Sequence, residues 1–156
     1  MLFRSRSTVQ SYGCQTTNHI NVLELVAFLN FVKLVVREQS SEPLRRFIQG
    51  ANPWNQALQL VGSDLVRVET MRASARSHPQ AAAKASELMN AISLVRLSPA
   101  HIALGATHPP PELRTLDALH LVTALTLTPE LVGMLTYDQR LGAAATQAGI
   151  KAYSPT

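Results

Sequence analysis

The chain has 156 residues, of which 46% are apolar, so it can bury one sizeable core but is short for two ordinary domains. Its only cysteine, Cys14, excludes a disulfide within the chain and a cysteine zinc site, and it fits the reducing cytoplasm, where we expect the protein to act. The net charge of +4 allows a polyanionic partner without requiring one. The apolar stretches 23–36 and 116–127 are broken by polar residues, so we expect no membrane span.

Residues 1–22 differ in composition from the rest of the chain. They contain no acidic residue and many Ser, Thr, Gln and Asn residues, and they show little apolar periodicity. This composition predicts a disordered or poorly packed tail, followed by one domain over residues 23–156.

From residue 22 onward, strand-like and helix-like segments alternate. The expected strands are 22–27, 58–61, 93–97, 131–137 and 150–153, and the expected helices are 31–36, 41–48, 65–75, 79–90, 99–106, 116–125 and 139–148. Ser41, Ser63 and Thr115 stand where helix caps are expected, and Gly50 and Gly149 where helices end. Alternation of this kind predicts an α/β fold in which helices cover both faces of a parallel sheet.

The three aspartates of the chain, Asp64, Asp117 and Asp138, all lie at expected starts of helices. Capping a helix is the commonest use of such an aspartate, so each of them alone favours a structural role. Together they suggest more, because the carboxyl ends of parallel strands are where α/β proteins bind ligands.

A cluster of Glu69, Asp117 and Asp138 would suit divalent metal chemistry. Hard cations such as Mg²⁺ bind ionised oxygen ligands, and two metals can activate a water and stabilise the leaving oxygen of a phosphodiester. The spacing of the three acids along the chain does not by itself show that they meet.

Three segments resemble the acidic motifs of the VapC toxins, which are PIN-domain ribonucleases of bacterial toxin–antitoxin pairs. Residues 63–69 resemble the second motif, with Glu69 as its acid; residues 113–121 resemble the third, around Asp117; and residues 135–141 resemble the fourth, around Asp138. The three motifs occur in the family's order over residues 32–155, which makes the match specific.

The resemblance implies a PIN-like three-layer α/β/α fold around a central parallel sheet. It also implies that Glu69, Asp117 and Asp138 are the catalytic and metal-binding residues of an endoribonuclease that depends on Mg²⁺ or Mn²⁺. The implied partners are an RNA substrate, a cognate antitoxin and a second copy of the chain in a homodimer. We expect the antitoxin surface around residues 32–36 and 44–48, which carry amphipathic patterns.

The chain departs from the family's pattern at the first motif. Counting back from Lys33 places Ala27 where an aspartate is expected, and Phe28 and Leu29 where a hydroxyl-bearing pair is expected. Glu24 is the nearest acid, but it lies three residues upstream, and an odd offset in a strand points to the opposite face.

His120, Thr136 and Trp54 also have two interpretations each. His120 follows Asp117 by one helical turn and could face the site, although a packed histidine is the commoner finding. Thr136 could bond Asp138 or simply be a β-branched strand residue, and Trp54 fits a lid over the core better than a platform for a nucleobase.

Three hypotheses for the function remain open. The first is a metal-dependent ribonuclease toxin weakened by the missing acid. The second is a catalytically impaired PIN fold that keeps its antitoxin-binding surface, and the third is the product of a disrupted reading frame, which would explain both residues 1–22 and the missing acid. RNA cleavage in a Mn²⁺ titration separates the first two hypotheses.

Overall fold

The computed structural model describes residues 26–29, 41–76 and 79–156, so the expected tail 1–22, Glu24 and the expected helix 31–36 lie outside the described residues. The strands are β1 (Val26–Leu29), β2 (Gln59–Ser63), β3 (Ser93–Val95), β4 (Leu131–Leu135) and β5 (Ala152–Tyr153). The helices are α1 (Ser41–Gln49), α2 (Asp64–Ala75), α3 (Pro79–Ala91), α4 (Pro99–Thr107), α5 (Thr115–Leu125) and α6 (Gln139–Gln147).

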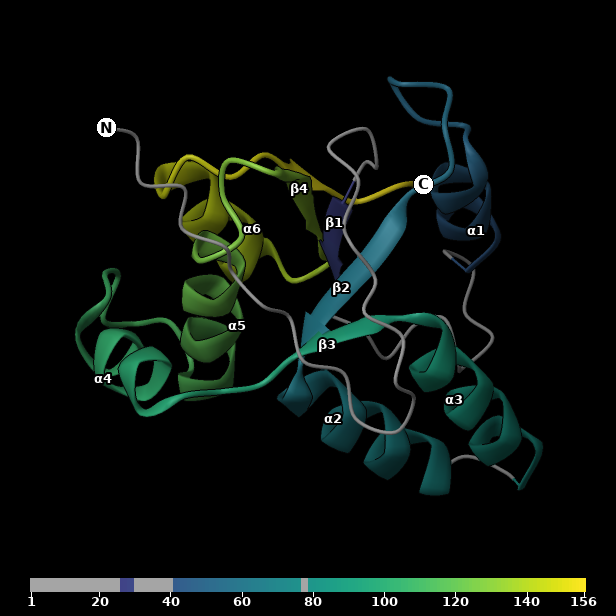
Figure 1. Cartoon of the computed structure of the whole chain (residues 1–156), viewed down its shortest axis with the longest axis horizontal. Helices are drawn as coiled ribbons and strands as arrows, with labels where there is room; N and C mark the ends of the chain where they lie inside the picture. The colour runs from purple at the N-terminus through teal and green to yellow at the C-terminus, as the bar shows by residue number, and fades with distance from the viewer. Residues whose placement is uncertain (1–25, 30–40, 77–78) are drawn as a thin grey trace, which may run out of the picture.

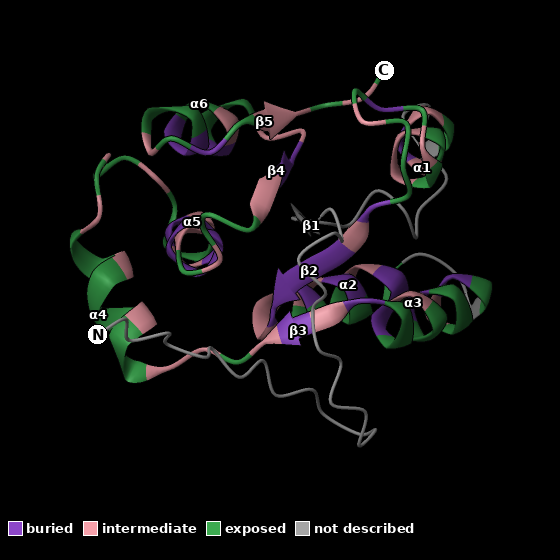
Figure 2. Cartoon of the chain, turned by 45° about the horizontal axis from the view of Figure 1, so that its top comes forward, coloured by how far each residue is buried: buried purple, intermediate pink, exposed green. Residues whose placement is uncertain are grey.

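These strands form one parallel sheet in the order β3-β2-β1-β4-β5 (Figures 1 and 2). The chain builds outward from β1 through β2 to β3, and then returns to the other side of β1 to add β4 and β5. In open α/β sheets, ligands bind at the carboxyl ends of the strands where the strand order reverses. That place lies here between β1 and β4.

Helices cover both faces of the sheet, as the sequence predicts. One buried cluster joins α1, α2 and α3 to the sheet through Leu44, Val66 and Met89. The other joins α5 and α6 to β4, with Leu121 and Leu141 at less than 1% exposure. Figure 2 shows α1, α2 and α3 on one side of the strands and α5 and α6 on the other. The three-layer α/β/α architecture is therefore confirmed.

Local interactions explain where the predicted and observed boundaries agree and differ. Gly50 and Gly149 end α1 and α6 with φ angles of 130° and 86°, a region that glycine adopts without strain. β4 ends at Leu135, two residues earlier than predicted, where the Thr136 hydroxyl accepts a hydrogen bond from the backbone N–H of Asp138 at 3.1 Å and turns the chain toward α6. β5 starts later than predicted because the N–H of Ile150 bonds the carbonyl of Ala145 at the end of α6.

Residues 153–155 brace the segment that leads from β4 into α6. The N–H of Thr136 donates to the carbonyl of Tyr153 at 3.0 Å, and the Tyr137 hydroxyl donates to the carbonyl of Pro155 at 2.7 Å. The Ser154 hydroxyl donates to the carbonyl of Thr136. The segment before Asp138 is thereby held by the last strand and the residues after it.

The loop after α1 also matches its expected role. The Asn52 amide donates to the carbonyls of Phe47 and Gln56, and its oxygen accepts from the N–H of Trp54. Trp54 packs edge-on against Tyr153, with the ring centroids 5.5 Å apart. It covers the core, as the sequence favoured. Among the helices that the structure describes, none has the length and apolar character needed to cross a membrane.

Candidate active site

Asp138 is fixed by the start of α6. It is the N-cap residue of this helix, and its Oδ1 accepts hydrogen bonds from the N–H groups of Arg140 at 2.8 Å and Leu141 at 3.1 Å. Both bonds use Oδ1, so they fix the direction of the carboxylate without using Oδ2. The capping role that the sequence favours for a single aspartate is therefore observed, and it leaves one oxygen for a ligand.

Asp117 lies in the first turn of α5, one position later than the sequence predicts. The N-cap is Arg114 rather than Thr115, and Arg114 makes no side-chain cap hydrogen bond, because its guanidinium cannot accept one. Burial raises the pKa of Asp117, and the negative charge of Asp138 raises it next. His120 and Arg114 lower this pKa, and Glu69 makes a smaller contribution that raises it.

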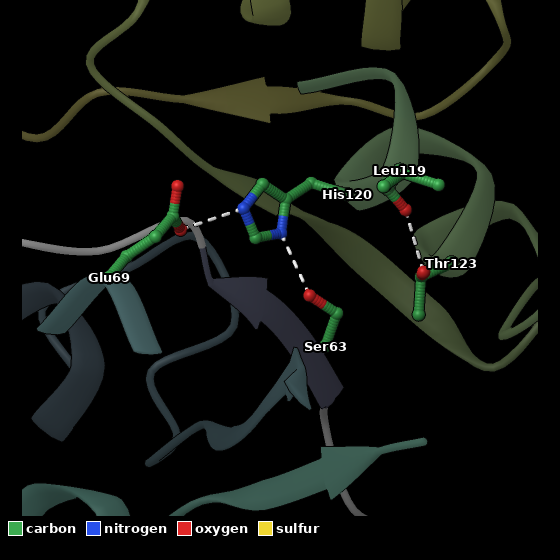
Figure 3. Close-up of polar contacts among 5 residues, drawn as sticks. All are labelled: Ser63, Glu69, Leu119, His120 and Thr123. Atoms are coloured by element: carbon green, nitrogen blue, oxygen red, sulfur yellow. Dashed lines mark hydrogen bonds and ion pairs between the residues drawn. The ribbon is translucent and has the colours of Figure 1, made fainter. Parts of the chain in front are cut away.

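Glu69 projects from the middle of α2, where it contacts a residue far away in sequence. Its Oε2 lies 2.8 Å from Nε2 of His120, and Nδ1 of the same ring lies 3.0 Å from the Ser63 hydroxyl oxygen (Figure 3). The His120 side chain is fully buried, whereas the Glu69 side chain is 26% exposed. The structure thus links the end of β2, α2 and α5 through one imidazole ring.

Ser63 occupies the N-cap position of α2, as predicted, but its side chain does not cap the helix. No side-chain cap bond is made there, and the hydroxyl contacts His120 instead. Asp64 begins α2 and belongs to no contact of this site that the structure describes. Beyond its capping position, no sequence pattern pointed to Ser63, while the spacing of His120 from Asp117 did indicate that His120 could face the site.

The three predicted acids converge only in part. Asp138 and Glu69 are both near enough to act on the charge of Asp117, so the three carboxylates share one region of the carboxyl edge. Within residues 26–29, 41–76 and 79–156, however, no three His, Cys, Asp or Glu side chains lie close enough to bind one metal ion together.

The register of β1 adds a finding about the missing first acid. Ala27 pairs with Leu60 on β2 and with Gly133 on β4, which places it three residues before Ser63 and five before Asp138. Three strand residues span about 10 Å. In this register Ala27 therefore lies in the middle of the sheet rather than at its carboxyl edge.

The sheet order and the acids at its carboxyl edge define a PIN-like α/β domain. The chain is 36% identical to Ribonuclease VapC46 of Mycobacterium tuberculosis (strain ATCC 25618 / H37Rv) over 125 residues, covering 80% of this chain and 92% of the relative. It is 33% identical to Ribonuclease VapC47 of M. tuberculosis (strain CDC 1551 / Oshkosh), covering 79% and 90% of the two chains. Ribonuclease VapC35 is 29% identical, covering 80% and 90%. No family model matches the chain. The chain belongs to the VapC family.

Proposed function

We propose that the chain is the toxin of a toxin–antitoxin pair and acts in the cytoplasm as a metal-dependent endoribonuclease. Its relatives are named ribonucleases, and the observation that carries the proposal for this chain is the electrostatics of Asp117. Burial makes the largest contribution to the raised pKa of this group, and the carboxylates of Asp138 and, more weakly, Glu69 raise it further. Like charges held together in this way are typical of a site that a cation neutralises.

The donor set fits Mg²⁺ or Mn²⁺. These ions favour carboxylate oxygens, and Mg²⁺ commonly uses only one or two of them and keeps several waters, so three acids need not meet at one ion. Asp117 and Asp138 would hold the metal, and Glu69 would bind it through a water or bind a second metal nearby. When bound, the metal would lower the pKa of a water and neutralise charge on the phosphodiester.

The residues of the chain would orient these ligands. The amides of α6 bind Oδ1 of Asp138 and do not use Oδ2, and the N-terminus of α5 favours the ionised form of Asp117 through the helix dipole. Burial opposes that ionisation, which is why the pKa of Asp117 is raised rather than lowered. Burial makes the ionised form of Asp117 unfavourable when no cation is bound, and a bound cation would relieve this cost.

We further propose that the missing first acid weakens metal binding, because affinity for a hard cation follows the charge and number of its ligands. The alternative is a PIN fold that binds its antitoxin without cleaving RNA. It differs from the first proposal in one respect that can be measured, namely RNA cleavage that depends on added metal.

The test is cleavage of a fluorescently labelled RNA by the full chain over a Mn²⁺ titration, with EDTA as the metal-free reference. Cleavage should rise with Mn²⁺ and should fall about 100-fold in Asp117→Asn, which keeps the size of the side chain but removes its charge. Asp64→Asn is the matched control, since Asp64 also begins a helix but takes no part in the site. Cleavage by Asp117→Asn equal to that of the wild type would overturn the assignment.

A pocket of about 460 Å³ between α1, β2 and α3 is the site we propose for the antitoxin. Ile48, Leu60 and Leu88 give it an apolar floor, and Arg45, Lys84 and Glu87 surround them. Leu44, also expected at this surface, is fully buried and belongs to the core, and residues 32–36 lie outside the described residues. An apolar groove with a charged rim suits an amphipathic segment of the antitoxin.

Ala91→Arg should lower antitoxin affinity at least tenfold, because it places a long charged side chain at an exposed position that lines the pocket. Ala83→Arg, at an exposed position of the same helix outside the pocket lining, is the control and should bind the antitoxin normally. Titration calorimetry with the antitoxin purified separately gives both values. Equal affinities of the two variants for the antitoxin would show that the antitoxin binds at another surface.

For the homodimer, we propose the apolar surface of α4 and the start of α5. Ile102 is 58% exposed, Leu104 44% and Leu116 46%, and α4 has no buried residue although most of its residues are apolar. Such a surface is unusual on a monomer. Ile102→Glu should convert a dimer into a monomer in sedimentation equilibrium, and an unchanged mass would exclude this surface.

A further inference from the structure

His120 is a fully buried side chain that contacts a proposed metal ligand, Glu69. It lies on α5, one turn after Asp117, and its ring reaches across to α2 and the end of β2 (Figure 3). Nε2 is 2.8 Å from Glu69 Oε2, and Nδ1 is 3.0 Å from Ser63 Oγ. Both nitrogens are thereby engaged inside the protein, so neither is available to an RNA substrate as an acid or base.

The carboxylate of Glu69 fixes the direction of one of these hydrogen bonds, whereas the direction of the bond to Ser63 depends on the protonation of the ring. An ionised carboxylate only accepts, so Nε2–H of His120 donates to Glu69. In the neutral ring Nδ1 then accepts, and the Ser63 hydroxyl donates to it. This explains why Ser63, although at the N-cap position of α2, makes no side-chain bond to that helix.

Within the part of the chain that the structure describes, the Glu69 side chain has no hydrogen bond besides the one to His120. It lies in mid-helix, its side chain has three rotatable bonds, and about a quarter of it is exposed to solvent. Asp138 differs, because the amides of its own helix fix it directly. A free glutamate would have to lose its rotamer freedom at the moment it bound a metal, which lowers affinity.

We propose that His120 is a positioning residue that holds Glu69 in one orientation, with Oε2 bound to the ring and Oε1 left for a divalent cation near Asp117 and Asp138. This inference rests on the proposed function, since it assumes that Glu69 is a metal ligand. Partners that orient a ligand in this way typically contribute 10- to 100-fold to metal affinity or activity.

Three substitutions at His120 separate orientation from packing. His120→Gln places an amide N–H near the position of Nε2 and keeps the donor to Glu69, whereas His120→Asn can replace only Nδ1 and does not reach Glu69. His120→Leu fills the volume without any polar group. Thr123→Val is the matched control, because Thr123 is also fully buried on α5, one turn further along, and donates to the carbonyl of Leu119 in its own helix.

The measurement is the affinity of the full chain for Mn²⁺ alone, read from the electron paramagnetic resonance signal of free Mn²⁺, with thermal unfolding to set equal folded fractions. His120→Asn and His120→Leu should bind Mn²⁺ about 10- to 100-fold more weakly, His120→Gln within about threefold of wild type, and Thr123→Val like wild type. In addition, the ¹⁵N spectrum of the metal-free wild type should show the ring proton of His120 on Nε2.

The outcomes distinguish a failure of this inference from a failure of the proposed function. Wild-type affinity in His120→Leu, or a loss in His120→Gln as large as that in His120→Leu, overturns the positioning role while leaving the metal site intact. A ring proton on Nδ1 overturns it as well. Mn²⁺ binding that Glu69→Gln and Asp117→Asn both leave unchanged refutes the proposed metal site, and the positioning role with it.

Discussion

Asp138 and Glu69 are two carboxylates of the proposed site, and they are held in place by different kinds of contact. Asp138 is held by N–H groups two and three residues ahead of it, within its own helix start. Glu69 is held by His120, 51 residues away in sequence, which in turn contacts Ser63. The first arrangement forms whenever α6 forms, whereas the second requires that α2, β2 and α5 have already packed together.

Because of this difference, substitutions at the two carboxylates should have different effects on stability. A carboxylate that caps its own helix contributes to stability as well as to chemistry, because the cap satisfies free N–H groups. A carboxylate tethered by a distant ring contributes to the site only in the finished fold. The following substitutions test whether stability and chemistry separate in this way.

The largest effect is expected at Asp138. Asp138→Asn keeps an oxygen that can cap α6 but removes the charge, so RNA cleavage should fall about 100-fold while stability stays near wild type. Asp138→Ala should lose the same activity and also about 1 kcal/mol of unfolding free energy, which corresponds to ~2–4 °C in melting temperature. Cleavage assays and thermal melts of both variants check this. Equal melting temperatures for the two variants would contradict the capping role.

A smaller effect, a rise of about tenfold in Mn²⁺ affinity, is expected when the first acid is restored at the right position. Counting along the sequence favours Ala27→Asp together with Leu29→Ser. The register of β1 places Ala27 about 10 Å before the level of Ser63, and so favours an acid beyond Leu29, for which we choose Asn30→Asp. Both proteins must be compared at equal folded fraction, because a new buried carboxylate costs stability without metal.

The variant that gains Mn²⁺ affinity and RNA cleavage shows at which position of the first strand the acid is needed. A gain with Ala27→Asp and Leu29→Ser shows that the strand register shifts when metal binds, and a gain with Asn30→Asp supports the register observed here. If neither variant gains, the activity is not limited by the first acid.

The smallest effect concerns stability at Asp117. Its pKa is raised in the folded chain, so the ionised group destabilises the fold at neutral pH, and this penalty is relieved as the pH falls through the folded pKa toward the unfolded one. Asp117→Asn should therefore unfold at a slightly higher temperature than wild type at pH 7. The gain in unfolding free energy should be about 1 kcal/mol or less, because solvent screens a half-buried group.

Thermal melts across pH measure this effect, and the difference between the two proteins should close at low pH. Addition of Mn²⁺ should stabilise the wild type but not the variant, since binding to the folded state alone raises stability. A variant less stable than wild type at pH 7 in EDTA would contradict the electrostatic account.

The residues that the sequence predicted correctly are those set by local interactions. The ends of α1 and α6 follow from Gly50 and Gly149, and the cap of α6 follows from Asp138 and the N–H groups after it. The fold class follows from the alternation of segments. Each of these depends on neighbours within a few residues.

The parts that the sequence could not predict depend on packing between distant segments. Nothing near Ser63 indicates that its hydroxyl leaves the helix start for His120, and nothing near His120 indicates that its ring would meet Glu69. The register of β1 against β2 and β4 is also a property of the packed sheet, and counting residues from Lys33 does not include it. The grouping of the three acids into one site is a prediction from the resemblance to a family rather than from spacing.

The bracing of residues 136 and 137 by residues 153–155 has a consequence for biosynthesis. The segment that leads to Asp138 is held by hydrogen bonds to Tyr153 and Pro155, which the ribosome adds only after α6. Domains begin to fold while they are being made, from the N-terminal side onward. A nascent chain that has formed β4 and α6 still lacks this brace, so the acidic edge reaches its final geometry only after residues 153–155 have emerged from the ribosome.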